Sequence, residues 1–345
     1  MMKLLCYADV QATDGSERCF GDPSVPLQQW RVVRFYERLL AVYTEHQCDG
    51  LVDLGDTTDD RSSIPMPTID AVIGGLEQFP DSDYHFKIIG NHEQYLRNTQ
   101  VNVGRMFSAK FTVIANTGVV EHDNLAMLFC SFPADHDALA KVIKSTAYEY
   151  RNKKLAMFGH FQAVGARMGS GEALTGIPKS VLKPFHVGML GHIHIPQTVL
   201  GNIHYVGSPF QQDFGEADED KRVGIVDTDT LKVTWVPLED FPRYYRVGLD
   251  EFEKSMAVDG ASEDRFQVCL HNQEEATRYF QHPQAHRAQA TYQYDVKETE
   301  KQEVSDGSWS FDSVLKRYLN RVPPSAAGIE HTSEEMLEFG IQITT

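Results

Sequence analysis

With 345 residues, of which 41% are hydrophobic and 23% charged, the chain has the composition of a soluble globular protein with two domains, or one large domain with an appendage. Its net charge of -17 excludes a protein that grips nucleic acid with its whole surface, but not one that acts on phosphate through bound cations. The 5 cysteines have no paired spacing, which predicts free thiols in a reducing compartment. The run from Met1 to Asp9 is too short for a signal peptide, and no stretch could span a membrane.

Short apolar strands alternate with amphipathic segments along most of the chain. Strands are predicted at 3–8, 50–56, 85–89, 125–130 and 155–158, in the run that ends at Leu190, and twice between 223 and 236. Helical spacing of apolar residues predicts helices at 27–43 and 66–79. Such alternation of strands and helices predicts an α/β layered fold.

Several of these strands end where a residue capable of binding a metal ion follows at once. These residues are Asp9, Gln11, Asp56, Asn91, His160, His192 and His194. Functional groups collect in loops beyond the carboxyl ends of strands, so we expect these side chains to converge on one cleft. Taken singly, each Asp is as readily explained by a solvated or helix-capping role and each His by a structural one. Together, carboxylate, amide and imidazole ligands fit two divalent cations of the manganese, iron or zinc type, which can clamp a phosphate for in-line attack.

The strand-end motifs resemble the signature of the calcineurin-like metallophosphoesterase family. They are Asp9-Val10-Gln11, Gly55-Asp56-Thr57-Thr58-Asp59, Gly90-Asn91-His92-Glu93, Gly159-His160 and Gly191-His192-Ile193-His194. The stretch from Gly191 to Gln197, followed by Tyr205 to Pro209, is similar to SbcD, the nuclease subunit that pairs with the SbcC ATPase and is related to the eukaryotic Mre nucleases. The resemblance covers roughly residues 1–240. It implies a four-layer αββα sandwich, two Mn²⁺ ions (with Mg²⁺ as an alternative) and cleavage of DNA phosphodiesters.

The resemblance also implies a role for each motif residue. It implies that one metal ion is held by Asp9, Gln11, Asp56 and His194, and the other by Asp56, Asn91, His160 and His192. His92 would face the phosphate, stabilising its charge or protonating the leaving oxygen, and Asp59 would orient the ring of His92. A hydroxide that bridges the metal ions would attack phosphorus, without a covalent enzyme intermediate.

Gln11 departs from the family pattern, which has Asp-x-His at the first motif. A glutamine side-chain oxygen can bind a hard cation, but it is a weaker donor to a transition metal than imidazole. The first metal site is therefore expected to bind loosely, to favour Mn²⁺ or Mg²⁺, or to give reduced activity.

Beyond residue 240 the pattern changes. Residues 241–305 predict a small α/β cap, with strands at 265–270 and 291–296 and a helix at 274–281. In the SbcD family such a cap covers the active site and helps to orient DNA, but its acidic balance here makes a packing role an equal alternative. Residues 306–345 predict two short amphipathic helices on either side of Pro323-Pro324. These helices either fold back on the core or dock on a partner, and the resemblance implies the coiled coil of an SbcC-like ATPase.

The resulting interpretation is the DNA exo/endonuclease subunit of an SbcCD-like complex, with 3′→5′ exonuclease and single-strand endonuclease activities. It would work as a homodimer in the cytoplasm of a bacterial cell or a phage-infected host. Two rivals stay open. One is a phosphoesterase of the same fold that acts on a small phosphodiester or a phosphoprotein. The other is a scaffold that binds DNA ends without cutting them, which the unusual Gln11 motivates.

Overall fold

The structure is a computed structural model that describes residues 2–96, 101–168, 174–217, 219–258 and 263–292. The predicted helical tail at 306–345 lies outside the described residues, as does the end of the predicted cap beyond Tyr292. No described helix has the length and apolar character needed to cross a membrane.

The first of two large sheets has the N-terminal strand near its centre. Its order is β12-β11-β1-β2-β3-β4. The strands are β1 (Lys3–Tyr7), β2 (Gly50–Asp53), β3 (Phe86–Ile88), β4 (Thr112–Ile114), β11 (Arg222–Asp227) and β12 (Val233–Pro237). Strands β1 to β4 are parallel, whereas β11 pairs antiparallel with both β1 and β12. The carboxyl ends of β1, β2 and β3 therefore lie along one edge of this sheet.

The second large sheet has the order β5-β6-β7-β8-β10-β9. Its strands are β5 (Thr117–His122), β6 (Leu125–Cys130), β7 (Lys154–His160), β8 (Val187–Gly191), β9 (Gln197–Leu200) and β10 (Ile203–Tyr205). The central strands β6, β7, β8 and β10 are parallel, and the edge strands β5 and β9 are antiparallel to their neighbours. Both large sheets are thus mixed, and the predicted α/β class is confirmed.

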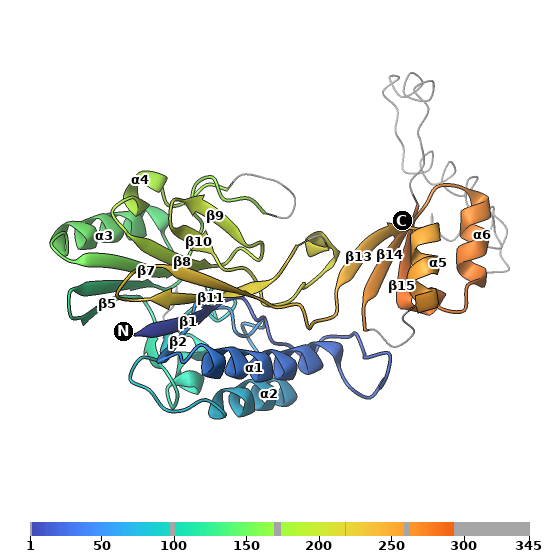
Figure 1. Cartoon of the computed structure of the whole chain (residues 1–345), viewed down its shortest axis with the longest axis horizontal. Helices are drawn as coiled ribbons and strands as arrows, with labels where there is room; N and C mark the ends of the chain where they lie inside the picture. The colour runs from blue at the N-terminus through green and yellow to red at the C-terminus, as the bar shows by residue number, and fades with distance from the viewer. Residues whose placement is uncertain (1, 97–100, 169–173, 218, 259–262, 293–345) are drawn as a thin grey trace, which may run out of the picture. The chain divides into compact units, whose positions relative to one another are not determined.

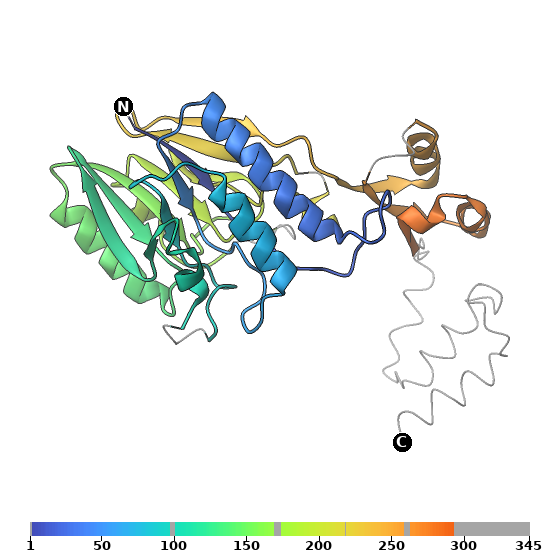
Figure 2. The same ribbon diagram turned by 90° about the horizontal axis from the view of Figure 1, so that it is seen from below.

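Helices cover the outer face of each sheet, which gives four layers (Figures 1 and 2). Helices α1 (Leu27–Glu45) and α2 (Met66–Glu77) pack on the first sheet, and α3 (His136–Glu149) and α4 (Lys179–Leu182) on the second. A third apolar cluster lies between the sheets, where Phe129 of β6 contacts Phe86 of β3 and Phe158 of β7 at ring-centroid distances of 4.9 and 5.0 Å. Both faces of each sheet are buried, which explains the near-continuous apolar runs of the sequence.

A third, smaller sheet follows residue 243. Its parallel strands are β13 (Tyr244–Gly248), β14 (Arg265–Leu270) and β15 (Ala288–Tyr292), with helices α5 (Leu249–Val258) and α6 (Gln273–Gln281). Phe252, Phe266 and Tyr279 form part of its own apolar cluster. Short 3-10 helices lie at η1 (Val103–Phe107), η2 (Phe214–Glu216) and η3 (Ala285–Arg287). The predicted domain limits at residues 240 and 305 stay predictions.

Two predicted strands differ from the structure by three residues at one end, more than the others do. The strand predicted at 50–56 ends at Asp53, because Gly55 and Asp56 adopt φ of 94° and 54°, which a strand cannot contain. The strand predicted at 291–296 begins at Ala288, where it pairs with β14, and is described as far as Tyr292. Helices α3, α4 and α5 were not predicted.

Replacing Phe129 by Ala should lower the free energy of unfolding by about 3–5 kcal/mol, because removal of the ring would leave a cavity in the apolar layer between the two sheets. Urea titration followed by circular dichroism measures this change. Met66→Ala is the matched control, since Met66 is 74% exposed and its replacement should change stability by less than about 0.5 kcal/mol. Equal effects of the two substitutions would contradict the packing described for the inter-sheet core.

Candidate active site

The polar residues predicted at strand ends lie at one edge of the two large sheets. Asp9, Asp56 and Asn91 follow β1, β2 and β3 of the first sheet, whereas His160 ends β7 and His192 follows β8 of the second. The loops are tied together by backbone hydrogen bonds, in which the amide of Asp9 donates to Gly55 O (3.0 Å) and the amide of Gln11 to Asp56 O (2.9 Å). The structure thus brings loops from both sheets to one place.

Four of these residues have left-handed backbone conformations. The φ angle is 56° at Asp9, 46° at Gln11, 54° at Asp56 and 90° at His192. Such angles are uncommon for residues other than glycine and persist only where the surroundings enforce them. Four such residues lie in one group of loops. Contacts between these loops therefore determine the directions of their side chains, in addition to the backbone preference of each residue.

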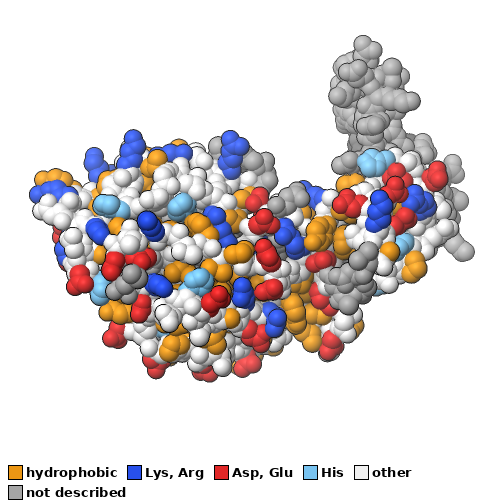
Figure 3. Space-filling model, viewed as in Figure 1, with side chains coloured by type: hydrophobic (Ala, Val, Ile, Leu, Met, Phe, Trp, Pro, Cys, Tyr) orange, Lys and Arg blue, Asp and Glu red, His pale blue; other side chains and the backbone are white. Residues whose placement is uncertain are grey.

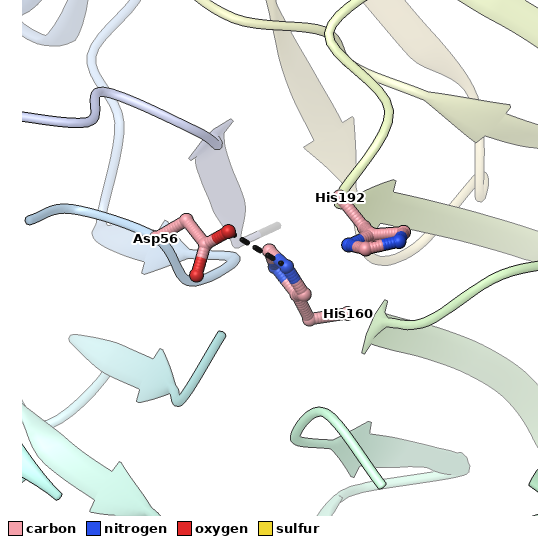
Figure 4. Close-up of side chains that lie close together, drawn as sticks. All are labelled: Asp56, His160 and His192. Atoms are coloured by element: carbon pink, nitrogen blue, oxygen red, sulfur yellow. Dashed lines mark ion pairs between the residues drawn. The ribbon is translucent and has the colours of Figure 1, made fainter. Parts of the chain in front are cut away.

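Asp56, His160 and His192 form the group of potential metal ligands that the described part of the chain contains. One ligand atom from each lies within 4.8 Å of the others, and the three side chains point toward one another in Figure 4. His160 Nε2 lies 3.3 Å from Asp56 Oδ2. The amide oxygen of Asn91 joins the group, 3.2 Å from His160 Nε2 and 2.7 Å from His192 Nδ1.

The chemistry of this group fits a cation. His160 Nδ1 must carry a proton, because it donates a 2.7 Å hydrogen bond to the carbonyl of Leu54. Its Nε2 then faces two oxygen acceptors, an arrangement that only a proton or a metal ion can satisfy. The separations of 2.7, 3.2 and 3.3 Å given above are close to the roughly 3 Å between adjacent ligands of a cation with bonds of about 2.1 Å.

The electrostatics agree with that conclusion. Burial opposes the charged form of His160, but Asp56 and Asp9 outweigh it and raise its pKa to about 9. Burial and the neighbouring His160 lower the pKa of His192 to about 3, so His192 is neutral and can offer a lone pair. Burial alone would raise the pKa of Asp56, but His160 and His92 hold it at about 2. The carboxylate is therefore ionised throughout the physiological range.

The residues predicted for the other metal ion are arranged differently. Asp9 is fully buried, and both of its carboxylate oxygens lie 3.0 Å from the backbone amide of His192. His194 Nδ1 donates to Glu216 Oε1 at 2.8 Å, and Gln11 lines a neighbouring cavity of about 400 Å³. Neither Asp9 nor His194 belongs to the 4.8 Å group, so their role as metal ligands stays a prediction.

His92 and Asp59 lie together beside the metal-ligand group. His92 Nδ1 lies 2.9 Å from Asp59 Oδ1 and 2.9 Å from the Asp59 carbonyl, and the His92 backbone amide donates to Asp56 Oδ1 at 2.8 Å. The hydrogen bond that His92 donates to the Asp59 carboxylate raises the pKa of His92 to about 9, against the opposing effect of burial. The imidazole is thus protonated at neutral pH, and its side chain is still 31% exposed.

A buried charge network that the sequence analysis missed supports the Asp56 loop. Lys87 Nζ lies 2.9 Å from Asp53 Oδ2 and 2.8 Å from Glu93 Oε1, with all three side chains excluded from solvent. Glu93 accepts backbone hydrogen bonds from Gly90 and Asp56 through Oε2 and from Thr57 through Oε1. The signal was present, because Asp53 and Lys87 are opposite charges inside apolar strand segments and are register partners in the sheet.

A second missed network holds His194. Glu216 Oε2 pairs with Lys221 Nζ at 2.5 Å, while Lys221 also donates to the His194 carbonyl at 2.9 Å. The amide of Ser208 donates to the same carbonyl at 3.1 Å, so the Tyr205–Pro209 stretch braces the His194 loop. Nothing in the spacing of Glu216 and Lys221 pointed to His194.

Replacing Lys87 by Met should destabilise the fold by about 3–5 kcal/mol, because Asp53 and Glu93 would be left as buried carboxylates without a counter-charge. Urea titration of the metal-free protein provides the measurement. The compensated control is Lys87→Met with Asp53→Asn and Glu93→Gln, which should recover part of the lost stability. A cost below about 1 kcal/mol for the single variant would show that the network does not support the loop as described.

Comparison with known proteins places these features in context. No family model matches the chain. In sequence, the chain is 25% identical over 207 residues to protein 078R of Invertebrate iridescent virus 3, which carries the provisional name of phosphoesterase. The match covers 58% of this chain and 58% of the viral protein, so the chain spans little more than half the length of that relative.

Among solved structures, the chain is similar to a dimetal phosphatase from Danio rerio, with TM-score 0.43, 10% identity, and coverage of 69% of this chain and 99% of the other. It is also similar to the calcineurin-like phosphoesterase YfkN from Bacillus subtilis, with TM-score 0.39, 10% identity, and coverage of 68% and 88%. For the nuclease MPE of Pseudomonas putida, the TM-score is 0.28 at 16% identity, with coverage of 58% and 66%. Since these TM-scores lie below 0.5, the chemistry of this chain has to be derived from its own residues.

Proposed function

We propose that the chain is a metal-dependent phosphoesterase of the calcineurin-like type, and that it hydrolyses phosphodiester bonds of DNA. The observation that carries this proposal is the group formed by Asp56, His160 and His192 beside His92. The carboxylate of Asp56 is a hard metal ligand, and the imidazoles of His160 and His192 are intermediate ones. The protonated imidazole of His92 lies beside them and is partly exposed. The sequence likeness to a viral protein named as a phosphoesterase supports the same reaction class.

In this proposal two metal ions are held by two sets of ligands that share Asp56. One ion would be held by Asp56, Asn91, His160 and His192, and the other by Asp9, Gln11, Asp56 and His194. When bound, the divalent ions supply Lewis-acid polarisation of the phosphate and acidify water. The oxygen-rich second set favours Mn²⁺ or Mg²⁺.

The protein's own contribution to bond cleavage would come from His92. Because Asp59 holds Nδ1, the opposite ring nitrogen, Nε2, can donate a proton to the leaving oxygen. With its pKa raised to about 9, the ring carries that proton at neutral pH. Asp59 would act as a positioning residue that keeps the ring in one orientation.

Support for DNA as the substrate comes from the resemblance of the Gly191–Gln197 and Tyr205–Pro209 stretches to SbcD. An SbcC-like ATPase partner and a homodimer are parts of the same proposal, and the partner contact would use residues 306–345, which lie outside the described residues. A small phosphodiester is the second candidate substrate. The Tyr205–Pro209 stretch contacts the His194 loop, and this structural role accounts for the stretch without a contact to DNA.

Purified full-length protein should release labelled nucleotides from linear duplex or single-stranded DNA with Mn²⁺, and EDTA should abolish this release. His92→Ala should lower the rate about 10²–10⁴-fold, because general acid catalysis is lost. His122→Ala is the matched control, since His122 lies on the edge strand β5 and should leave the rate unchanged. Equal rates with and without EDTA would contradict the metal-dependent mechanism, and faster cleavage of a nucleotide diester than of DNA would favour the second candidate substrate.

Gln11→His should tighten Mn²⁺ binding or shift the metal preference towards transition metals, because imidazole is a better donor than an amide oxygen. Calorimetric titration with Mn²⁺ and Mg²⁺ measures both effects without relying on catalysis. Gln28→His serves as a control on helix α1, since Gln28 hydrogen-bonds the Gln11 carbonyl and Gln212 but is not a predicted metal ligand. Identical affinities and preferences for Gln11→His and the parent chain would remove Gln11 from the metal site.

A further inference from the structure

Arg31 on helix α1 is a buried cation that makes no ion pair with any carboxylate of the described residues and is linked to Glu17 only through the hydroxyl of Tyr244. The residue is 1% exposed, and Nη1 donates a 3.3 Å hydrogen bond to the hydroxyl of Tyr244. Its Nε and Nη2 atoms are buried without any hydrogen-bond partner. Within the described part of the chain, no carboxylate forms an ion pair with this guanidinium.

Such an arrangement is costly unless something else compensates the charge. The guanidinium carbon lies 5.1 Å from the ring centroid of Tyr244 and 5.8 Å from that of Phe210. These cation–π contacts offset only part of the cost of removing a charge from water. Buried charges in proteins are normally paired, so an unpaired arginine next to a cavity is suited to an anion that arrives from outside.

The cavity beside Arg31 shares two lining residues, Gln11 and Asp59, with the candidate active site. It has a volume of about 400 Å³ and is lined by Gln11, Gln28, Arg31, Asp59, Gln212 and Tyr244, among others. Gln28 Nε2 donates to the Gln11 carbonyl at 3.2 Å and to Gln212 Oε1 at 3.3 Å. Gln11 and Asp59, both predicted site residues, therefore share one cavity with Arg31.

The acidic residues of the cavity limit which anions can bind. Glu17, Asp59 and Asp213 also line it, and Glu17 accepts a 3.0 Å hydrogen bond from Tyr244. These carboxylates disfavour a free anion. A phosphate carried on the same molecule as the scissile group has a high effective concentration, which offsets that repulsion. The cavity thus fits a tethered phosphate better than a free one.

We propose that Arg31 binds a second phosphate of the substrate, next to the scissile phosphate along a polynucleotide strand. This inference rests on the proposed function and names the residue that would distinguish a strand from a substrate with one phosphate. Basic and acidic side chains are interspersed on the face shown in Figure 3. With a net charge of -17, the chain has to recognise phosphates through individual cationic sites.

The test is the salt dependence of binding, measured by fluorescence anisotropy with a labelled single-stranded oligonucleotide and the full chain in EDTA. Arg31→Met should weaken binding about tenfold or more and make the slope of log affinity against log salt shallower by about 0.7, the value for one lost phosphate contact. Arg31→Lys should retain the slope. Arg34→Met is the matched control, because Arg34 is exposed on the same helix and pairs with Glu37.

An unchanged slope for Arg31→Met, or no binding by the parent chain, would overturn the proposal. If circular dichroism shows that Arg31→Met does not fold, Arg31→Gln replaces it. The slope of log affinity against log salt should then become shallower by the same amount as expected for Arg31→Met. Titration with inorganic phosphate forms a separate arm, and displacement of the oligonucleotide by phosphate at equal concentration would also overturn the proposal. Cleavage with Mn²⁺ is scored independently. A changed slope without cleavage refutes only the proposed function, whereas cleavage with an unchanged slope refutes only the role of Arg31.

Discussion

The buried contact of Lys87 with Asp53 and Glu93 determines the shape of the candidate site. One ammonium group compensates two carboxylates, which can then serve as acceptors for the backbone. Glu93 accepts from three amides in the loops after β2 and β3, which would otherwise be buried without partners. Asp53 accepts from the amide of Gly55 and the hydroxyl of Thr57. The loop that carries Asp56 is therefore held from both sides.

This support makes the unusual backbone of the site possible. A left-handed residue has an intrinsic cost of about 1–3 kcal/mol, and four of them lie in the loops around Asp56. The hydrogen bonds between the Asp9 and Asp56 loops offset that cost only if both loops are in place together. The close approach of Gly90 illustrates the constraint, because a Cβ there would lie 2.0 Å from Asp56 Oδ1. The site is thus a cooperative unit of several loops.

The sequence predicted what depends on local pattern. Apolar runs followed by a Gly-Asp or Gly-His pair predicted strands β2, β7 and β8, although β2 ends at Asp53, before its Gly-Asp pair, and β7 continues to His160. The α/β class followed from the alternation of such runs with helices. What it missed depends on contacts between distant segments. Glu216 reaches His194 across 22 positions, and no periodicity encodes that pairing. Likewise, no local pattern encodes the hydrogen bond between the buried Arg31 and Tyr244, 213 positions away. The roles of the site residues, and the domain limits, stay predictions.

The two sheets contribute different kinds of donor to the site. Asp9, Asp56 and Asn91 of the first sheet present oxygen, whereas His160 and His192 of the second present nitrogen. A metal ion bound by both kinds of donor would act as a cross-link between the halves of the sandwich. The free energy of metal binding would then also stabilise the packing of the two sheets against each other. A shift of one sheet relative to the other would therefore change the distances between oxygen and nitrogen donors, and with them the affinity for the metal ion.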